Sequence, residues 1–379
     1  MRDLIRAHGA HVPELAARLA RAGIDPRGDS LDDAALRRVP LLRKSALRAL
    51  QAAAPPWGGM LADGFKPSAA FLSPGPIAEP LVPRMVERLA AMLVEAGFGA
   101  GQTVLNGFGY HVTPAGMLFH EALVRAGCRV LPAGPQNTAT LVEYARALGA
   151  NAFVGIASHL KILFEAEPTL RIRLAMAGAE PNADRIRATL KERHGVRCID
   201  MYGFAEAGIV AASCAAGALH LHPDVTAEVL DPASGGAVEP GEAGELVVSL
   251  DNPGFPLLRF ANGDWVRIAP GGCACGRVGT LQVLGRADQS VRVKGMLLHP
   301  SQLQAFMAAV GADACRVAVT RHDDRDRIAV AWRPGAGAPA DAGAIDERFR
   351  DACRMRADSI EIDPALAAGS CVLEDHRRA

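Results

Sequence analysis

Three cysteines and two histidines of this 379-residue sequence lie between residues 214 and 275, where short strands are predicted. Cys214, His220 and His222 come before a turn-rich segment, and Cys273 and Cys275 follow it as a Cys-x-Cys pair. Thiolate sulfur and imidazole nitrogen are the ligands of tetrahedral structural zinc, in which four ligands close the site. The pattern therefore indicates a zinc ion that ties two loops together. Because Cys-x-Cys is tighter than the usual Cys-x₂-Cys, reduced thiols without a metal are an equal alternative.

A second candidate site is the string Asp200-Met201-Tyr202-Gly203-Phe204-Ala205-Glu206. It stands at the end of a predicted strand, and ligands of open α/β sheets bind in the crevice at the carboxyl ends of the strands. Taken alone, the string favours an ordinary turn with a surface glutamate, because both are common.

Further strings in a fixed order change this interpretation. They are Ala177-Gly178-Ala179-Glu180-Pro181, Leu257-Leu258-Arg259-Phe260-Ala261-Asn262-Gly263-Asp264, the run GRADQSVRVKG at 285–295, and His299-Pro300-Ser301-Gln302-Leu303. With the tyrosine string they resemble, in order, the G-[AG]-E-P, Y-G-x-[ST/A]-E, P-L-[IL]-R-Y-R-T-G-D, G-R-x-D-D-x-[IL]-x-[IV]-[RK]-G and x-P-x-[QE]-[IL] motifs of adenylate-forming ligases. Residues 22–48 resemble the opening of phenylacetate-CoA ligases, so the resemblance spans essentially the whole chain.

The resemblance implies ATP or AMP, Mg²⁺ and coenzyme A as cofactors. The implied nucleotide-binding positions are Gly178, Ala179, Glu180, Pro181, Tyr202, Gly203, Asp264 and Arg286. Glu206 and Arg286 would be catalytic: Glu206 would hold Mg²⁺, while Asp264 and Arg286 would bind the ribose. A carboxylate suits two ribose hydroxyls because it accepts two hydrogen bonds at once. Asp288 would be the hinge about which a small domain rotates between adenylation and thioester formation.

The same resemblance bears on the zinc. Cys273-Ala-Cys275-Gly-Arg is similar to the Cys-Pro-Cys-Gly-Arg of many phenylacetate-CoA ligase relatives. His220 matches a Gly-Leu-His of these relatives, which favours the set Cys214, His220, Cys273 and Cys275 as metal ligands.

Two features depart from the family pattern. The phosphate loop, S-S-G-T-T-G-K-P-T in the family, falls on AFLSPGPIAEP at 70–80, where prolines remove N–H donors and Glu79 adds repulsion. Only Ser73 and Gly75 remain as phosphate contacts. No lysine follows Lys294 in this sequence, although family members bridge carboxylate and α-phosphate with a lysine there. Arg377 or Arg378 would have to supply the charge, in a different geometry.

The acyl pocket is expected, by family analogy, around Tyr110, His111 and Ser158, with Phe108, Gly109 and His159 beside them. Packing at the ends of strands is the alternative role for Tyr110 and His111.

Charge and composition argue against several other classes of protein. Lys plus Arg equals Asp plus Glu at 41 each, so no net field attracts nucleic acid or an anionic membrane. No apolar run of about 18 residues occurs, so we expect no signal peptide and no membrane span. Eight cysteines in so long a chain do not form a secreted disulfide framework. We expect a cytoplasmic protein whose partners are a small carboxylic acid and a thiol acceptor, with a homodimer left open.

The predicted fold class is α/β with a second, smaller domain. Alternating strands and helices between residues 82 and 194 predict a parallel sheet flanked by helices. The expected core at 1–285 consists of a helical cap at 1–54, an α/β part at 55–200 and an antiparallel β subdomain at 201–285, with a hairpin of 225–230 and 244–250. A small α+β domain at 286–379 is expected to contain helices at 301–310 and 344–353 and a turn at 322–326.

The expected function is that of an AMP-forming acid:CoA ligase acting on an aryl or arylacetic acid through an acyl adenylate. One alternative is a degenerate ligase fold that binds nucleotide or acyl ligand without adenylation. The other is an enzyme of the acyl-transfer half-reaction alone, which needs neither a triphosphate grip nor the lysine.

Overall fold

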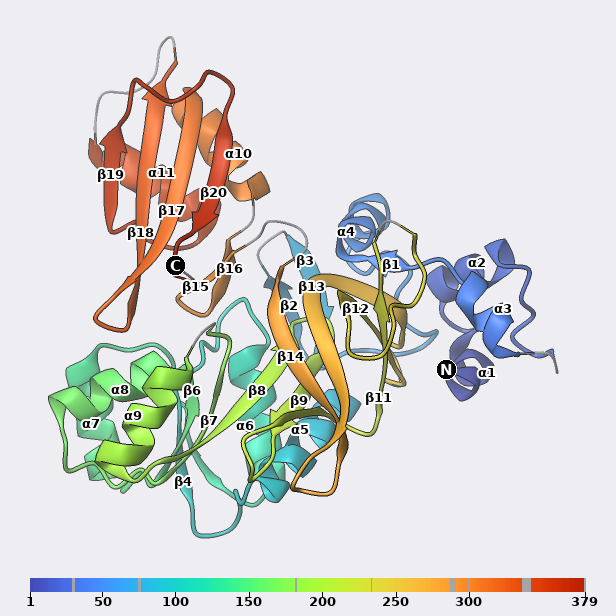
Figure 1. Cartoon of the computed structure of the whole chain (residues 1–379), viewed down its shortest axis with the longest axis horizontal. Coiled ribbons are helices and arrows are strands. Elements are labelled where there is room, and N and C mark those ends of the chain that lie inside the picture. Colours follow the sequence, from blue (N-terminus) through green and yellow to red (C-terminus); the bar gives the residue numbers. More distant parts are fainter. Residues whose placement is uncertain are drawn as a thin grey trace. The chain divides into compact units, whose positions relative to one another are not determined.

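The computed structural model describes residues 1–28, 31–73, 76–180, 183–232, 234–286, 291–298, 300–335 and 342–377 (Figure 1). It divides into two units, which are taken separately: unit 1 comprises Met1–Gly178 and Thr189–Ala287, and unit 2 comprises Ala179–Ala188 and Asp288–Ala379. The main division falls after Ala287, where the sequence predicted it after residue 285. Arg286 therefore belongs to unit 1.

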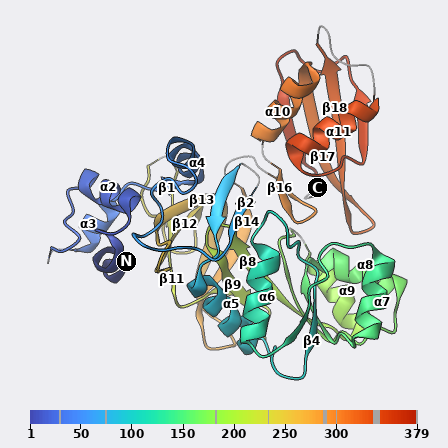
Figure 2. The ribbon, with the colours of Figure 1, turned by 180° about the vertical axis from the view of Figure 1, so that it is seen from behind.

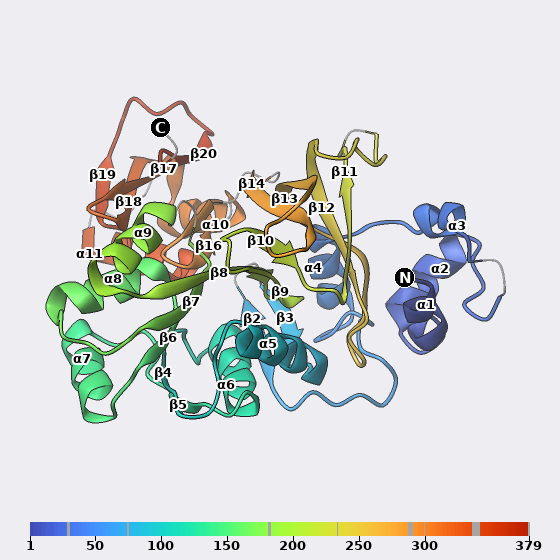
Figure 3. The same ribbon diagram turned by 60° about the horizontal axis from the view of Figure 1, so that its bottom comes forward.

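A seven-stranded sheet forms the centre of unit 1, in the order β10-β9-β8-β7-β6-β4-β5 (Figure 3). Its strands are β4 (Thr103–Asn106), β5 (Arg129–Leu131), β6 (Ala152–Gly155), β7 (Leu174–Gly178), β8 (Arg197–Phe204), β9 (Gly208–Ser213) and β10 (Leu219–Leu221). β4 to β8 run parallel, and β9 and β10 are antiparallel additions. β4, β6 and β7 are buried along their whole length, as strands covered on both faces are. The predicted parallel α/β fold is confirmed.

Five helices connect and flank these strands. They are α5 (Pro83–Glu95), α6 (Ala115–Arg125), α7 (Thr138–Ala147), α8 (Ala157–Ala166) and α9 (Asp184–His194). α5 packs on α6, and α7 packs on α8 (Figures 1 and 2). In α5 the buried Met85, Leu89 and Leu93 recur every fourth residue, which gives the helix one apolar face.

A second sheet of unit 1 has the order β1-β13-β12-β11, with β14 paired to β13. Its strands are β1 (Leu42–Arg43), β11 (Val225–Leu230), β12 (Ala243–Leu250), β13 (Leu257–Gly272) and β14 (Val278–Arg286). The hairpin of β11 and β12 matches the predicted one. The predicted β subdomain began at residue 201, but β8 to β10 extend the large sheet instead, because β8 runs through that point and pairs with β7.

The N-terminal region is helical, as predicted, with α1 (Arg2–His8), α2 (Pro13–Arg21), α3 (Asp33–Arg38) and α4 (Lys44–Ala53). Buried Arg18 joins it to the second sheet: the guanidinium donates to the carbonyl of Pro40 at 3.0 Å and to that of Leu258 at 2.9 Å. The short strand β1, which the sequence did not predict, pairs in parallel with β13. A hairpin of β2 (Ala70–Ser73) and β3 (Ile77–Pro80), also unpredicted, occupies the altered phosphate-loop segment.

Unit 2 contains a four-stranded sheet in the order β19-β18-β17-β20 and a hairpin of β15 and β16. Its elements are β15 (Val291–Val293), β16 (Met296–Leu298), α10 (Pro300–Val310), β17 (Ala312–His322), β18 (Arg325–Pro334), α11 (Ala342–Cys353), β19 (Ser359–Ile362) and β20 (Cys371–Asp375). Phe306 of α10 meets Phe349 of α11 edge to face. Both predicted helices and the predicted turn between β17 and β18 are present. Among the described residues of the chain, no helix has the length and apolar character needed to cross a membrane.

Candidate active site

The carboxyl ends of β7 and β8 lie side by side, with Gly178 opposite Met201. A Cβ atom on Gly178 would lie 2.6 Å from the Met201 carbonyl oxygen, so this position accepts only glycine. Ala179 follows with φ 60°, a left-handed conformation that turns the chain sharply away from the strand. Glu180 comes next, and Pro181 is outside the described residues.

Tyr202, Asn262, Asp264 and Arg286 come together from β8, β13 and β14. The Tyr202 hydroxyl donates to Asp264 Oδ2, and Asn262 Nδ2 donates to the same oxygen at 2.6 Å. Arg286 donates to Asp264 Oδ1 at 2.8 Å. An ionised carboxylate has about four acceptor sites, and donors from the described residues fill three of those on Asp264. The fourth, on Oδ1, receives no donor from the described residues.

The turn that carries Glu206 is closed by two glycines and one buried arginine. A Cβ on Gly203 would lie 2.3 Å from the Gly208 carbonyl oxygen, which explains glycine after the tyrosine. Arg88 of α5 donates to the Ala207 carbonyl at 2.6 Å and to the Ile209 carbonyl at 3.2 Å. The arginine thus fixes the backbone on the C-terminal side of Glu206.

Glu206 is completely buried, and neither of its carboxylate oxygens accepts a hydrogen bond from the described residues. The Lys44 ammonium lies 3.0 Å from Glu206 Oε1, close enough for an ion pair but not aligned as a hydrogen bond. Lys44 begins α4, which is tied to β3 because the side-chain amide of Gln51 exchanges two 2.8 Å hydrogen bonds with the backbone of Ala78. A buried carboxylate with unused oxygens suits an oxygen-seeking cation.

Glu79 of β3 is buried beside this group. Its carboxyl group accepts hydrogen bonds from the Ser73 hydroxyl and, at 3.2 Å, from the Ser73 N–H. Burial, reinforced by the negative charge of Glu206, raises the pKa of Glu79 to about 8. Ser73 therefore binds Glu79, where the sequence predicted a phosphate contact. Gly75 is outside the described residues.

The predicted acyl-pocket residues lie where β4 and β6 end. Buried Asn106 donates to the Tyr110 hydroxyl at 2.8 Å, and that hydroxyl lies 3.1 Å from His120 Nδ1. Burial raises the pKa of Tyr110 to about 12, which keeps the phenol protonated. His111 is exposed and Ser158 is half-buried in the first turn of α8. The structure therefore supports a fixed Tyr110 and leaves the pocket as a prediction.

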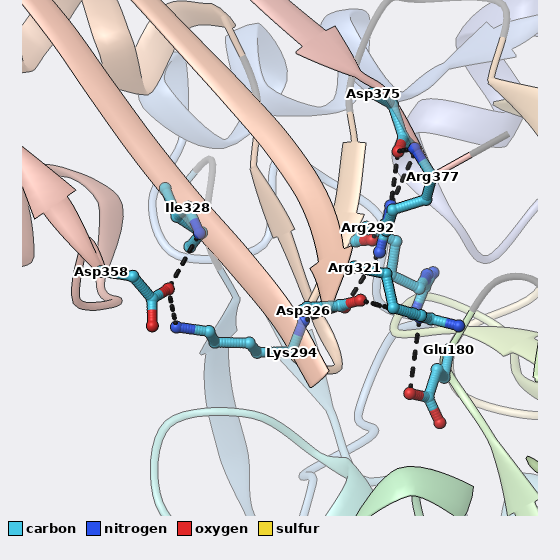
Figure 4. A network of polar contacts seen from close by, with 9 residues as sticks. All are labelled: Glu180, Arg292, Lys294, Arg321, Asp326, Ile328, Asp358, Asp375 and Arg377. Carbon is cyan, nitrogen blue, oxygen red and sulfur yellow. Dashed lines mark hydrogen bonds and ion pairs between the residues drawn. The ribbon is translucent and has the colours of Figure 1, made fainter. Parts of the chain in front are cut away.

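In unit 2, buried Asp326 is the centre of a polar network (Figure 4). Arg377 donates to Asp326 Oδ2 at 2.9 Å and to both oxygens of Asp375 at 2.7 Å. Its side chain is only 1% exposed. With its guanidinium held in this way, Arg377 is not available to replace the missing lysine, and Arg378 is outside the described residues.

The remaining contacts of this network involve Arg321 and Lys294. Arg321 pairs with Asp326 at 2.8 Å and with Glu180 at 3.5 Å (Figure 4). Lys294 donates its N–H to Asp326 Oδ2 at 3.0 Å, and its ammonium pairs with Asp358 at 2.7 Å. The predicted hinge residue Asp288 falls outside the described residues.

The four predicted zinc ligands Cys214, His220, Cys273 and Cys275 form one cluster in unit 1, in which the potential ligand atoms all lie within 4.8 Å of one another. The sequence thus correctly grouped residues from turns that are far apart along the chain. His222 is not part of the cluster, and its imidazole lies 3.8 Å from Asp224.

Known proteins resemble this chain in both sequence and fold. Residues 109–253 match the family model described as AMP-binding enzyme. The chain is 27% identical over 323 residues to the phenylacetate-coenzyme A ligase of Thermus thermophilus, a match that covers 79% of this chain and 71% of that protein. The chain thus resembles the adenylate-forming, phenylacetate-CoA ligase-like superfamily. The phenylacetate-coenzyme A ligase of Pseudomonas putida is 28% identical over 236 residues, which is 57% of this chain and only about half, 52%, of the relative.

Solved structures show the same fold. A 2-hydroxyisobutyryl-CoA ligase in complex with 2-HIB-AMP and CoA matches 99% of this chain and 88% of its own, with a TM-score of 0.84 at 20% identity. The amide bond synthetase McbA of Marinactinospora thermotolerans matches 74% of this chain and 62% of its own, with a TM-score of 0.57 at 18% identity. At these identities the likeness concerns the adenylate-forming fold alone.

Sequence reasoning missed several residues of this candidate site. It singled out neither Lys44 as the partner of Glu206, nor Arg88 as the anchor of its turn, nor Asn262 as a donor to Asp264. Lys44 lies within residues 22–48, which resemble the opening of phenylacetate-CoA ligases, and this resemblance was its one signal in the sequence. Arg88 stands on the buried face of α5 at helical spacing from Met85 and Met92, and a charge there marks a residue with partners.

Proposed function

We propose that the chain is an AMP-forming acid:CoA ligase that activates an aryl or arylacetic acid as an acyl adenylate. The observation that carries this proposal is Asp264, which Tyr202 and Arg286 orient and which keeps one acceptor site for a hydroxyl. Phenylacetate-coenzyme A ligases as sequence relatives support the acid class.

Asp264 is assigned the role of binding the ribose hydroxyls of the nucleotide. Its carboxylate accepts one hydroxyl at Oδ1 directly, and displacement of Asn262 from Oδ2 would admit the second. Arg286 holds the carboxylate in place and neutralises it, so that the hydrogen bonds to the sugar keep a fixed direction.

Glu206 is assigned to Mg²⁺, because its oxygens are buried and accept no hydrogen bond from the described residues. A magnesium ion there would neutralise charge on the phosphates. Lys44 must then withdraw from Oε1 or share it, and its partly exposed side chain, at 22%, has room to move.

The reaction has two steps. A substrate carboxylate oxygen attacks the α-phosphorus of ATP in line, and pyrophosphate leaves with the electrons of the broken P–O bond. The thiol sulfur of CoA then attacks the acyl carbon, and AMP leaves as the thioester forms. Tyr110, whose hydroxyl contacts Asn106 and His120, is assigned to the wall of the acyl pocket in both steps.

The test is hydroxamate formation with a panel of aryl and aliphatic acids, ATP, Mg²⁺ and hydroxylamine. We expect a signal with an aryl or arylacetic acid that Glu206→Gln lowers at least about tenfold, as loss of one electrostatic contact does. Glu192→Gln, at an exposed position of α9, is the matched control and should retain the signal. No signal with any acid from a folded protein would contradict the proposal.

The second candidate is the acyl-transfer half-reaction on a preformed acyl adenylate. Buried Glu79 favours it, because its carboxyl group accepts both the N–H and the hydroxyl of Ser73, which are then not donated to the β and γ phosphates of ATP. An acyl adenylate carries only the α-phosphate and does not need these donors.

Calorimetric titration separates the two candidates. Under the ligase proposal, ATP with Mg²⁺ binds at least as tightly as AMP. Under the half-reaction, AMP binds and ATP binds more weakly. If neither nucleotide binds the wild type, both candidates are wrong.

A further inference from the structure

We propose that Cys214, His220, Cys273 and Cys275 bind one structural zinc ion that joins the two sheets of unit 1. The proposal is independent of the proposed ligase activity, because the cluster shares no residue with the nucleotide site.

Distances within the cluster already fit a tetrahedron. Zinc–sulfur bonds of about 2.3 Å place two thiolates of a tetrahedral site about 3.8 Å apart, and a thiolate and an imidazole nitrogen slightly closer. Cys214 Sγ lies 3.7 Å from Cys273 Sγ, and Cys275 Sγ lies 3.5 Å from His220 Nε2. These two pairs form opposite edges of the tetrahedron, and no ligand atom is farther than 4.8 Å from another.

Two turns of the same construction present the cysteines. In each, the cysteine N–H donates to the carbonyl four residues later, at 2.9 Å for Cys214 and 2.8 Å for Cys273. In each, a glycine three residues after the cysteine donates back to the cysteine carbonyl at 2.9 Å. These glycines, Gly217 and Gly276, have φ values of 82° and 86°, which other residues rarely adopt. The second turn also supplies Cys275. His220, in the strand β10 that follows the first turn, is the fourth ligand.

His220 is oriented for metal binding. Its Nδ1 lies 2.8 Å from the carbonyl oxygen of Gly279, which accepts a hydrogen bond and so assigns the proton to Nδ1. The Nε2 lone pair then faces the thiols. A ligating histidine whose other nitrogen donates to a backbone carbonyl is the usual arrangement at protein zinc sites. His220 is also buried, at 2% exposure, so its direction is fixed by packing.

Four protein ligands close the coordination shell, which is typical of a structural site with no position for a substrate. Three thiolates and one imidazole favour zinc over the hard cations Mg²⁺ and Ca²⁺. The first turn joins β9 to β10 and the second joins β13 to β14, so the ion would fasten the large sheet to the second sheet. β14 ends at Arg286, and the ion would hold the other end of that strand.

The first test is metal content. The full chain, purified with reducing agent and desalted, should carry about one zinc per molecule by plasma mass spectrometry. Cys275→Ser and His220→Ala should lower this at least about fivefold, because a site with three ligands binds zinc far more weakly. His222→Ala is the matched control, since this histidine lies two residues away and outside the cluster, and should keep its zinc.

A second measurement protects the test against variants that do not fold. Cobalt exchanged into the wild-type protein should give the thiolate charge-transfer absorption of a tetrahedral site, and a chelator should abolish it and lower the Tm. Wild-type protein without metal and with all three cluster thiols open to alkylation would overturn the proposal. Zinc that persists in both ligand variants, or a Cys214–Cys273 disulfide in place of zinc, would overturn it as well.

Discussion

At the scale of single residues, the charges around Glu206 are the least ordinary feature of the site. Glu79 and Glu206 are both buried, and the charge of Glu206 raises the pKa of Glu79. The positive charge of the Lys44 ammonium partly compensates for the negative charge at this pair of carboxyl groups. The site therefore holds a protonated glutamic acid at neutral pH, where family members have a loop that binds phosphates.

The first prediction concerns Glu79 and pH. Its folded pKa of about 8 lies above the ordinary value of 4.5, so the folded protein binds this proton more tightly than the unfolded chain. The resulting stabilisation is complete below about pH 4.5 and is lost as the pH rises through 8. Glu79→Gln should thus resemble the wild type in Tm near pH 5 and exceed it by roughly 3 °C or more at pH 8.5. Thermal unfolding at several pH values checks this, and parallel profiles for the two proteins would contradict it.

The second prediction concerns Asp264. Asp264→Asn keeps the shape of the side chain but loses the charge that pairs with Arg286 and that, in the proposed function, accepts the ribose hydroxyls. AMP affinity should fall about tenfold or more, as expected for hydrogen bonds to a charged group. Calorimetry measures it, and the exposed Asp33→Asn serves as the control. An unchanged affinity would remove Asp264 from the nucleotide site.

At the scale of elements, helix α5 positions the turn that carries Glu206. Arg88→Met should destabilise the protein by about 3 kcal/mol, because three buried acceptors lose their donor. Arg84→Met, one helical turn earlier with a side chain 41% exposed, should cost less than about 1 kcal/mol. Urea unfolding of the two variants compares them directly. Equal losses would show that Arg88 does not anchor the turn.

The regular elements were predictable from the sequence for a clear physical reason. Buried parallel strands such as Ala152–Gly155 and Leu174–Gly178 are continuous apolar runs, and the intervening helices have apolar residues at helical spacing. The motif strings singled out Tyr202, Asp264 and Arg286, and the structure brings these three side chains together.

Other elements depend on contacts that a local pattern does not contain. β1 has only two residues and is extended because it pairs with Phe260 and Ala261 of β13. The β2–β3 hairpin crosses a segment rich in proline, and its polar interior contact, Ser73 with Glu79, has no apolar signal. Lys44 meets Glu206 across 162 residues of sequence, a pairing that only the fold creates.

At the scale of the whole molecule, each unit has its own stabilising centre. In unit 2, Asp326 accepts from Arg321, Arg377 and the backbone of Lys294, so it ties β18 to the residues after β20. Asp326→Asn removes the buried charge that Arg321 and Arg377 share and should destabilise unit 2 by about 3 kcal/mol. Hydrogen exchange of β17, β18 and β20 in the full chain checks this.

Asp313→Asn is the control for that experiment, because Asp313 forms a half-exposed pair with Arg333 at 3.3 Å. It should change exchange in these strands by less than about 1 kcal/mol. Equal effects of the two substitutions would contradict a central role for Asp326.

The measurement that tests the ligase proposal most directly is mass spectrometry of one reaction mixture containing phenylacetate and related aryl acids, ATP, Mg²⁺ and CoA. The proposal predicts an acyl-CoA and AMP in equal amounts with the wild type, and a loss of both products with Asp264→Asn. AMP and acyl-CoA that are absent from every mixture containing folded wild-type protein would contradict it.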